Sequence, residues 1–521
     1  MLQRTKSRRG GEQSVERPTR RTAGLMAIGA VMLVVGRCLA LPLGKPTNKN
    51  TMGGDQPRRA ISVMEFGALG DGVTNDSVAI TKADAAAASA RVPLYFPVGI
   101  YLTAPTRATT SWLGAGSRRS ILRSLSRDSE FTNLVVADGV DDIRFMDLGF
   151  DGNVSADPGQ WDDRSYDKFS GTAGLSVETC RGAAVLRCEA TNTRQHGFRF
   201  VRVANGQIES CVSQRARGTF GDGFLILSSS DIVFTRCVAR DYTRIGFVAD
   251  RTSAGEEPCR RITLRDCSAT DGHHGSQLYG GTESNAGVWV ENCVDALVER
   301  VIVARNADRG ISICTGERAT GSDSVTSTAI LRECQTIGGT FGICVYSLGN
   351  LAIDATITDC TADHARIAFQ ACANNAADRF TWTDCHAIYD ASVSNGRGFA
   401  TEVTGTSGLG RPRFIVGAGC TVTRFAEDPR KLTDAGSGAA TADIGGFYAP
   451  AGGMNLTVAG TRSSSGGPIF IRWYNDHPHV IYLKDVDAVV SNQGGGTVVS
   501  VERATIRYRP GDVVQPSARA R

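Results

Sequence analysis

Eight cysteines recur at intervals of two to three dozen residues along the middle of this 521-residue chain, and most of them end the same six-residue phrase. Copies of the phrase lie at residues 183–188, 206–211, 232–237, 262–267, 329–334, 355–360 and 380–385, and in residues 296–301 Val301 replaces the cysteine. Repeats of this length are typical of solenoids, in which neighbouring units bury each other's apolar faces.

The spacing of apolar residues within the phrase predicts β-strands. The third and fifth positions before the cysteine are apolar or small, and the two positions directly before it are mostly polar, which is a period of two that ends at a corner. Two expected columns of inward residues follow, one before and one after the cysteine. They are Val185, Ile208, Phe234, Leu264, Val298, Leu331, Ile357 and Trp382, and then Ala190, Ser213, Ala239, Ala269, Val303, Thr336, Ala362 and Ala387.

A second marker, glycine followed by an apolar residue, opens another strand in most repeats. Its glycines are Gly174, Gly197, Gly223, Gly246, Gly287, Gly310, Gly342 and Gly398. Two or more short strands per repeat, separated by turns, predict an all-β chain folded as a parallel β-helix, whose coils stack about 4.8 Å apart.

The cysteines themselves are expected to be structural. No CxxC spacing occurs, so the pattern does not favour a metal or redox site. Cysteine is often fully buried as a small apolar side chain, which suits a column inside the coils. The odd total of 15 cysteines argues against a complete disulfide framework, and reduced thiols indicate folding in a reducing compartment before export.

Residues 1–40 have the layout of an export signal, with basic residues followed by an apolar run from Thr22 to Gly36. Arg20 and Arg21 directly before this run resemble a twin-arginine signal, and cleavage after Ala40 would give a secreted or periplasmic protein. The alternative is an N-terminal membrane anchor, but 15 apolar residues are fewer than the roughly 20 that span a bilayer.

Removing residues 1–40 changes the charge balance. It takes away eight Lys/Arg and two Asp/Glu, which leaves 49 minus 51, or a net charge of −2. Neither a nucleic-acid partner nor a membrane association is therefore expected after signal removal. We divide the remainder into a linker (41–60), a β-helix domain (61–425) and a C-terminal region of short strands (426–521), either final coils or a β cap. The sequence does not indicate an oligomeric state.

At the start of the β-helix domain, Asn75 or Asp76 is expected to cap a helix that runs to about Ala90. Its face of Val78, Ile80, Ala83 and Ala87 would cover the open end of the coils, because bare strand edges promote aggregation.

Residues 65–80 and 93–102 resemble the N-terminal signature of the pectate-lyase-like superfamily, with Phe66-Gly-Ala-Leu-Gly-Asp-Gly72 and Phe96-Pro-Val-Gly-Ile-Tyr101 carrying the likeness. The resemblance implies a right-handed parallel β-helix. It does not fix the reaction, because the superfamily includes polygalacturonases, rhamnogalacturonases, pectate lyases, uronan epimerases and non-catalytic phage tailspikes.

Coil register would place distant polar residues side by side in one strip, just before the glycine marker and on the adjacent turns. His, Asp and Arg side chains suit acid/base chemistry and the binding of anionic sugars. From this strip we take Asp222, His196 and Arg244 as candidate catalytic residues, and Arg194, Arg217, Asp241 and Tyr242 as candidate substrate-binding residues.

The longest insertion in the middle of the domain, residues 271–285, leaves from the same side. Loops on a rigid scaffold often form the walls of a binding groove. His273, His274 and Tyr279 are therefore further candidates for substrate contact, and a solvated loop without function is the alternative.

The strip matches the polygalacturonase motifs poorly. That family carries Asn-Thr-Asp, Gly-Asp-Asp, Gly-His-Gly and Arg-Ile-Lys on consecutive coils, with carboxylates as acid and base. Here Arg194, Gly223 and Ile245 occupy motif positions, so that only Asp222 carries over. A pectate-lyase mechanism would use an arginine such as Arg217 or Arg244 as the base, with Ca²⁺ on a carboxylate cluster. The carboxylates are sparse, so no cofactor or metal ligand is assigned, and Ca²⁺ is expected only if the protein is a lyase.

Two hypotheses remain. The first is an enzyme that cleaves glycosidic bonds in an acidic, uronate-containing polysaccharide, with hydrolysis and elimination unresolved. The second is a non-catalytic carbohydrate-binding β-helix of the tailspike or adhesin kind, or a uronan epimerase. Binders favour exposed Trp and Tyr side chains, which are few along the strip, so the sequence favours an enzyme.

Overall fold

The structure is a computed structural model that describes residues 59–508 except 126–132, 155–171, 219, 254, 274–284, 307, 317–325, 349–350, 392–395, 405–410, 426–441, 447–452, 474–478 and 493–497. The chain divides into two compact units, residues 1–53 and 54–521, and the described residues belong to the second. The expected signal segment therefore lies outside the described residues. Among those that are described, no helix has the length and apolar character needed to cross a membrane.

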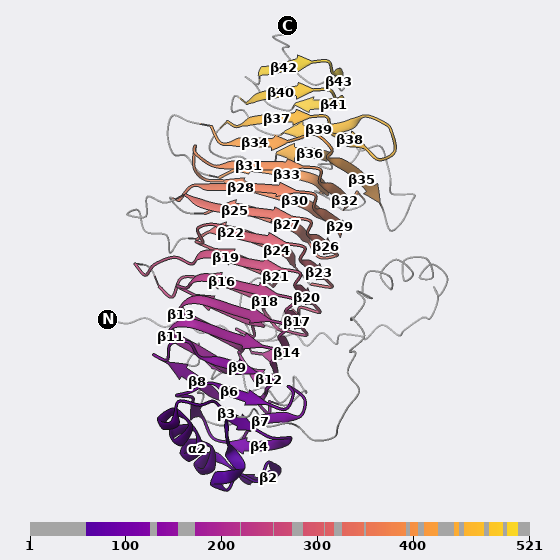
Figure 1. Ribbon diagram of the computed structural model, residues 1–521. Helices are drawn as coiled ribbons and strands as arrows, with labels where there is room; N and C mark the ends of the chain where they lie inside the picture. The colour runs from indigo at the N-terminus through magenta and orange to yellow at the C-terminus, as the bar shows by residue number, and fades with distance from the viewer. Residues whose placement is uncertain are drawn as a thin grey trace, which may run out of the picture. The chain divides into compact units, whose positions relative to one another are not determined.

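Parallel strands stack in successive coils, and each full coil has three faces (Figure 1). The glycine-marked face consists of β5 (Thr106–Arg107), β8 (Val135–Asp138), the first halves of β11 (Ala173–Leu186) and β13 (His196–Glu209), β15 (Phe224–Leu227), β18 (Ile245–Asp250), β21 (Ala286–Glu291), β24 (Arg309–Thr315), β27 (Phe341–Ser347), β30 (Ile367–Ala373), β33 (Arg397–Val403), β36 (Ala442–Gly446), β39 (Ile469–Trp473), β41 (Asp487–Asn492) and β43 (Thr505–Tyr508).

The phrase face contains the cysteine-ended repeats. It consists of β1 (Ile61–Ser62), β3 (Leu94–Phe96), β6 (Trp112–Gly114), β9 (Arg144–Met146), the second halves of β11 and β13, β16 (Ser230–Thr235), β19 (Arg260–Arg265), β22 (Ala296–Glu299), β25 (Ser327–Arg332), β28 (Ile353–Thr358), β31 (Arg379–Thr383), β34 (Arg413–Val416), β37 (Asn455–Ala459), β40 (Val480–Lys484) and β42 (Val498–Glu502).

The short-strand face forms a separate sheet. It consists of β2 (Asp71–Asn75), β4 (Gly99–Thr103), β7 (Ser120–Ser124), β10 (Gly149–Asp151), β12 (Glu189–Arg194), β14 (Val212–Arg217), β17 (Val238–Arg240), β20 (Ser268–Thr270), β23 (Ile302–Ala304), β26 (Gln335–Ile337), β29 (Thr361–Ala365), β32 (His386–Asp390), β35 (Thr421–Phe425) and β38 (Arg462–Ser463). All pairings are parallel, so the predicted all-β fold, a right-handed parallel β-helix, is confirmed.

The two expected inward columns are also confirmed by strand register. Val185 pairs with Ile208, and the chain of pairings continues through Phe234 and Leu264 to Trp382, all buried. After the cysteine, small residues stack from Ala190 onward. On the glycine-marked face, the rings of Phe198, Phe224 and Phe247 lie parallel, with centroids 5.0 and 4.8 Å apart.

The residue before each cysteine turns the chain at the corner between the phrase face and the short-strand face. Arg187, Arg236 and Asp266 have φ values of 53–55° in this position, and the following cysteine points inward. The Sγ of Cys237 donates a hydrogen bond to the carbonyl oxygen of Ile208 on the preceding coil, at 3.4 Å. The fourteen cysteines that the structure describes are buried and unbridged, as expected for structural thiols.

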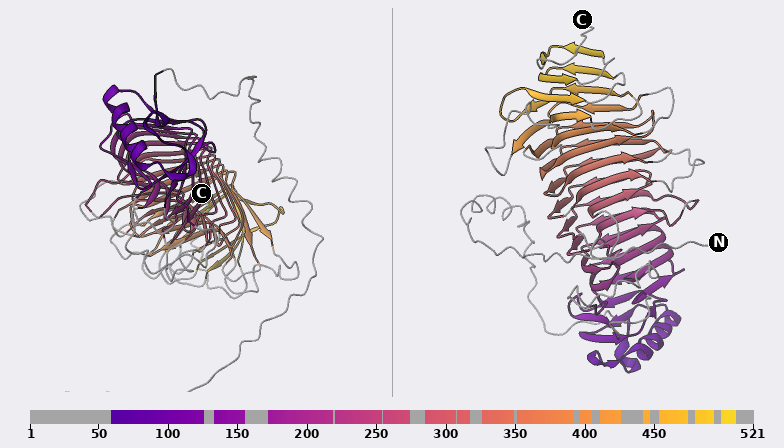
Figure 2. Two further views of the ribbon diagram at one scale, coloured as in Figure 1. Left: turned by 90° about the horizontal axis from the view of Figure 1, so that it is seen from below. Right: turned by 180° about the vertical axis from the view of Figure 1, so that it is seen from behind.

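Helix α2 (Ser77–Ala90), preceded by the short 3-10 helix η1 (Val63–Phe66), covers the N-terminal end of the stack (Figure 2, left). Ile80, Ala83 and Ala87 are buried as expected, but Val78 is 64% exposed. The expectation for Val78 is wrong because residues two apart lie on opposite sides of a helix. Asp76 holds the N-cap position, yet its side chain accepts hydrogen bonds from the backbone of Leu69 and Gly70 instead of capping the helix.

Strands β36 to β43 lie in the C-terminal region that the sequence left as either coils or a cap. Strand β38 is the last strand of the short-strand face, and the others extend the phrase face and the glycine-marked face with unchanged parallel pairing. In Figure 1 these strands lie at the end opposite α2.

Candidate active site

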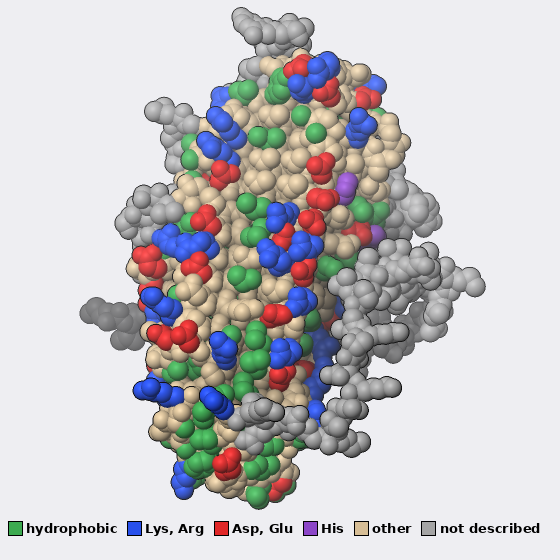
Figure 3. Space-filling view, in the orientation of Figure 1, with side chains coloured by type: hydrophobic (Ala, Val, Ile, Leu, Met, Phe, Trp, Pro, Cys, Tyr) green, Lys and Arg blue, Asp and Glu red, His purple; other side chains and the backbone are tan. Residues whose placement is uncertain are grey.

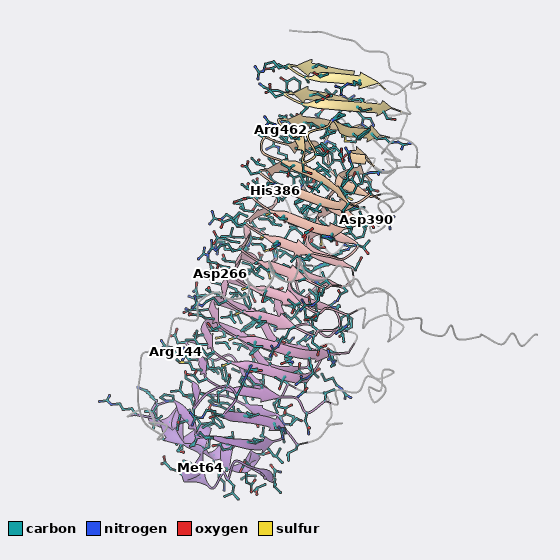
Figure 4. The ribbon with its side chains drawn as sticks, turned by 90° about the vertical axis from the view of Figure 1, so that its right-hand side faces the viewer. Met64, Arg144, Asp266, His386, Asp390 and Arg462 are labelled. Atoms are coloured by element: carbon teal, nitrogen blue, oxygen red, sulfur yellow. The ribbon has the colours of Figure 1, made fainter. Side chains whose placement is uncertain are left out.

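The predicted strip follows one edge of the stack, where the short-strand face meets the glycine-marked face. Figure 4 labels Asp390, at the end of β32, on this edge, and it labels Asp266, His386 and Arg462 on the opposite edge, where the cysteines turn inward. On the strip edge, register places His196 beside Asp222, because the residues two positions later, Phe198 and Phe224, pair directly. The predicted juxtaposition of these two residues across adjacent coils is therefore present.

Asp222 lies at the centre of a buried cluster. Its side chain is fully buried, and Arg244 donates to both carboxylate oxygens, from Nε to Oδ1 at 2.8 Å and from Nη2 to Oδ2 at 2.6 Å. Nδ1 of His196 lies 3.3 Å from Oδ2 of the same carboxylate. The guanidinium of Arg244 also stacks over the ring of Phe220, at 4.8 Å from its centroid. Asp222 therefore orients Arg244 through two hydrogen bonds, and its carboxylate faces the His196 ring.

Burial and charge act in opposite directions on the two titratable groups of this cluster. Burial by itself would raise the pKa of Asp222, but the Arg244 guanidinium and the His196 ring outweigh it, so that the pKa is lowered. Burial lowers the pKa of His196, although the Asp222 carboxylate acts in the opposite direction. At neutral pH the site thus contains an ionised Asp222 and a neutral imidazole.

A cavity of about 570 Å³ opens in front of this cluster on the glycine-marked face. His196 and Arg244 line it, although the His196 side chain is only 2% exposed, whereas Asp222 lies behind them. The other lining residues are Arg199, Asp250, Arg251, Thr252 and Glu291, together with the apolar or aromatic Phe220, Leu225, Leu227, Ile245, Val248 and Trp289. The cavity therefore combines basic, acidic and apolar groups contributed by four consecutive coils.

The acidic and basic groups of the cavity come from different strands. Arg199 on β13 donates to Ser176 Oγ at 3.1 Å and forms an ion pair with Glu178 on the coil before it. Asp250 and Glu291 end β18 and β21, and their preceding residues, Ala249 and Val290, pair directly. The two carboxylates thus occupy neighbouring positions on adjacent coils. Trp289 Nε1 donates to Glu291 Oε2 at 2.9 Å.

Three other predicted residues form a second cluster on the same edge. Arg217 Nη2 donates to Asp241 Oδ2 at 2.9 Å, and His273 Nε2 lies 2.9 Å from Asp241 Oδ1. Burial would raise the pKa of Asp241, but the contacts with His273 and Arg217 outweigh it and lower the pKa. Asn285 connects the two clusters, because its side-chain amide donates to the backbone oxygens of both Arg244 and His273.

Tyr242 and Arg194, two further predicted residues, are not among the residues that line the cavity. Tyr242 is 1% exposed and donates to Asn306 Oδ1 at 2.6 Å. Arg194 is half-buried, with its backbone paired to Arg217. His274 and Tyr279 lie outside the described residues.

Five lining residues were not predicted from the sequence: Arg199, Asp250, Arg251, Trp289 and Glu291. These residues lie at or just beyond the outward positions of β13, β18 and β21. Other outward positions on this face, such as Leu225 on β15 and Val248 on β18, are buried and apolar. A strand that is apolar on both sides gives no alternation from which an outward position can be recognised. The charged residues within these otherwise apolar strands were the sequence feature from which the cavity lining could have been predicted. Among the described residues, no group of three His, Cys, Asp or Glu side chains is arranged to hold a metal ion.

Comparison with known families supports the resemblance seen in the sequence. Residues 60–138, which include α2 and the first coils, match the family model described as rhamnogalacturonase A/epimerase, pectate lyase-like. The described coils carry the parallel β-helix onward from this match. The superfamily resemblance is confirmed. None of the curated protein sequences matches the chain.

Several solved structures are similar to this chain. The A-module of the mannuronan C-5 epimerase AlgE6 from Azotobacter vinelandii is 13% identical, with 86% of this chain and 99% of that one covered and a TM-score of 0.49. The A-module of AlgE4 from the same organism is 15% identical, with coverages of 87% and 99% and a TM-score of 0.42. An exopolygalacturonase from Thermotoga maritima is 12% identical, with coverages of 87% and 93% and a TM-score of 0.34. At these values the likenesses say nothing about the reaction.

Proposed function

We propose that the protein is an enzyme acting on a uronate-containing polysaccharide, and that its reaction begins with removal of the proton at C5 of a uronate residue. The observation that carries this proposal is the neutral His196 at the wall of the cavity, supported by the buried Asp222 and adjacent to Arg244. Elimination and epimerisation both begin with this step.

The chemistry of C5 explains why these groups are suitable. The C5 proton lies next to the uronate carboxylate, and its removal places a second negative charge on that group. Arginine binds carboxylates through several N–H donors and keeps its charge at any physiological pH. Arg244 and Arg199 would bind the carboxylate and stabilise the charge that develops on it. Each already contacts one protein carboxylate, which fixes its orientation, and its five N–H groups allow a second partner.

His196 is the proposed base. A general base must be unprotonated near the working pH, and the lowered pKa of His196 satisfies this. Nδ1 is directed at Asp222, so Nε2 is the nitrogen assigned to the substrate. In elimination, the C5 proton passes to His196, the C4–O4 glycosidic bond breaks, and the departing oxygen takes a proton from a general acid. In epimerisation, a proton returns to the opposite face of C5 and no bond to the neighbouring sugar breaks. Asp222 is a positioning residue in both.

A second candidate reaction, hydrolysis, is favoured by Asp250 and Glu291. Two carboxylates about one coil spacing apart, on the order of 5 Å, resemble the acid and nucleophile of a retaining glycosidase. In that case the glycosidic bond would break through attack at the anomeric carbon, and C5 would keep its proton. The Ca²⁺ expected for a lyase is not assigned to any residues, and export likewise stays a prediction from residues 1–40.

Turnover in deuterium oxide distinguishes these reactions. Polygalacturonate, alginate and other acidic polysaccharides would be incubated with the full-length protein and analysed by mass spectrometry and proton NMR. Unsaturated ends indicate elimination, while deuterium at C5 in an intact polymer indicates epimerisation. New reducing ends without either signal indicate hydrolysis and contradict the proposed proton abstraction.

Two variants test the site. His196→Gln is expected to abolish the unsaturated or deuterated product, whereas His386→Ala, an exposed histidine on the opposite edge, serves as the matched control and should keep activity. Binding of the polymer without any turnover in the panel would favour the non-catalytic alternative instead.

A further inference from the structure

Another arginine cluster on the strip edge, far from the cavity, repeats the construction of the Asp222–Arg244 cluster. Asp443 on β36 is fully buried, and Arg424 at the end of β35 donates to both of its oxygens, with Nε to Oδ1 at 2.8 Å. Tyr389 donates to the same carboxylate at 3.0 Å, and the backbone N–H of Phe470 does so at 2.7 Å. A buried aspartate thus fixes an arginine here just as Asp222 fixes Arg244.

The likeness extends to the aromatic support. The guanidinium of Arg424 stacks over the ring of Phe470 at 4.4 Å from its centroid, compared with 4.8 Å for Arg244 over Phe220. Arg424 is 21% exposed and Arg244 is 13% exposed, so both side chains are ordered by protein contacts and still reach the surface. Stacking leaves a guanidinium weakly hydrated and fixed in one plane, which favours the capture of a carboxylate.

A third stacked arginine lies between them. Arg309 at the start of β24 contacts the rings of Trp289, Phe341 and Tyr346 at 5.2–5.6 Å, and it donates to the hydroxyl of Tyr346. Within the part of the chain that the structure describes, the arginines stacked on aromatic rings are these three, and all lie on the strip edge. A line of arginines of this kind fits a polyanion that runs across the coils.

We propose that Arg424, supported by Asp443 and Phe470, is a secondary binding site for carboxylates of the same polysaccharide that occupies the cavity, with Arg309 as an intermediate contact. Seven strand pairings separate β15 from β36, which corresponds to about 34 Å at the spacing of paired strands. A polymer can contact both sites, whereas a short oligosaccharide cannot. The proposal rests on the proposed function only in the identity of the ligand.

Two linked sites raise the affinity for a ligand long enough to reach both, because the second contact becomes intramolecular. Loss of the Arg424 site should therefore weaken binding of long polygalacturonate or alginate by about tenfold or more and leave binding of short oligosaccharides unchanged. In turnover assays, the same change should raise KM for polymer and leave kcat and the oligosaccharide KM as they are.

The test uses full-length protein and measures polymer and oligosaccharide binding by calorimetry, so that it does not depend on turnover. Arg424→Lys keeps the positive charge beside the buried Asp443 but removes the planar guanidinium group that donates two parallel hydrogen bonds. Phe470→Leu removes the aromatic ring under Arg424 and keeps the ion pair with Asp443. Arg503→Lys is the matched control, because Arg503 also donates to both oxygens of an aspartate, Asp485, without an aromatic support. Thermal melts verify that all three variants fold.

Selective loss of polymer binding in both Arg424→Lys and Phe470→Leu, with Arg503→Lys unchanged, supports the proposal. Equal affinity of wild type and variants for the polymer overturns it, and so does a parallel loss for polymer and oligosaccharide. If the protein binds no uronate polymer at all, the proposed function fails as well. If polymer binding is intact in every variant but turnover depends on His196, the proposed function stands and the secondary site does not exist.

Discussion

The two edges of the short-strand face differ in what changes from coil to coil. At the cysteine edge the same small thiol recurs with the same burial and the same corner conformation, and Val301 and Thr461 take its place without a break in register. At the strip edge, equivalent positions carry His196, Asp222, Ile245, Ala286 and Arg309 in turn. The repeated cysteine stabilises the stack in the same way in each coil. The strip edge carries a different residue in each coil, so a functional site can form there.

The two regions also differ in how exposed their acidic and basic side chains are. Along the stack in Figure 3, Lys and Arg side chains alternate with Asp and Glu, as in the ion pairs of Asp231 with Arg261 and of Asp354 with Arg379 on the phrase face. These exposed pairs contribute little to stability but keep the face free of a single-sign charge. On the strip edge, the acidic partners Asp222 and Asp443 are fully buried, and only the arginines reach the surface.

The largest expected effect falls on the strip edge. His196→Gln should reduce turnover by a factor of about 10²–10⁴, because that is the usual contribution of a general base. Initial rates on the best polymer of the panel provide the measurement, and urea denaturation should show that stability is little changed. Retention of more than half of the activity would remove His196 from the mechanism.

Inside the stack, truncation of a buried aromatic side chain should lower the stability of the fold without changing the catalytic residues. Phe234 is fully buried and packs against Phe200, Phe224 and Phe247. Phe234→Ala should lower the free energy of unfolding by about 3–5 kcal/mol. Chemical denaturation followed by circular dichroism measures this. A loss below about 1 kcal/mol would contradict the assignment of this column to the core.

The third prediction concerns pH. The Asp222 carboxylate raises the pKa of His196, so Asp222→Asn should move the acid limb of the rate profile to lower pH as it lowers the maximum rate. In the wild-type protein, the lowered pKa of His196 means that the unfolded state binds the proton more readily. Stability should therefore decline as the pH falls below the ordinary histidine value of about 6.5. An acid limb that moves upward in Asp222→Asn would exclude His196 as the titrating base.

At the cysteine edge, the expected effect is smaller. Cys237→Val should cost less than about 1.5 kcal/mol and leave activity intact, because Val301 already occupies the equivalent position in another coil. Burial raises the pKa of the Cys237 thiol well above its ordinary value, so that thiol reagents should not label it until the protein unfolds. Labelling of the folded protein at Cys237 would contradict the structural role.

The smallest effect is expected at an exposed corner. Arg305 donates to both oxygens of Asp271 on the preceding coil, at 2.6 and 2.8 Å, and the two side chains are 62% and 39% exposed. Arg305→Ala should cost at most about 1 kcal/mol, and the difference should shrink at high salt. A larger, salt-independent loss would mean that these corner pairs determine coil register.

The fold could be predicted from the sequence because the same pattern of apolar residues and cysteine occurs in many coils. The position of Phe234 relative to Cys237 recurs in coil after coil, so that one misread coil does not change the result. The juxtaposition of His196 and Asp222 followed from the same register. The role of Asp222 did not, because sequence spacing says which coil a residue occupies but not whether its side chain reaches solvent or lies behind Arg244.

Other functional residues could not be predicted from the sequence for a different reason. Asp250 and Glu291 end strands whose outward residues are apolar and covered, which removes the alternation that normally identifies an exposed side chain. Arg424 and Asp443 are brought together by one coil spacing at the end of the repeat region, where the phrase has faded from the sequence. Sites of this kind depend on individual contacts that occur once, and no repetition reveals them.

The most direct test of the central claim is a crystal structure of the His196→Gln variant with a bound uronate oligosaccharide. We predict electron density in the cavity on the glycine-marked face, with a sugar carboxylate at Arg244 and C5 facing position 196. Density on the phrase face or along the cysteine edge, with the cavity empty, would contradict it.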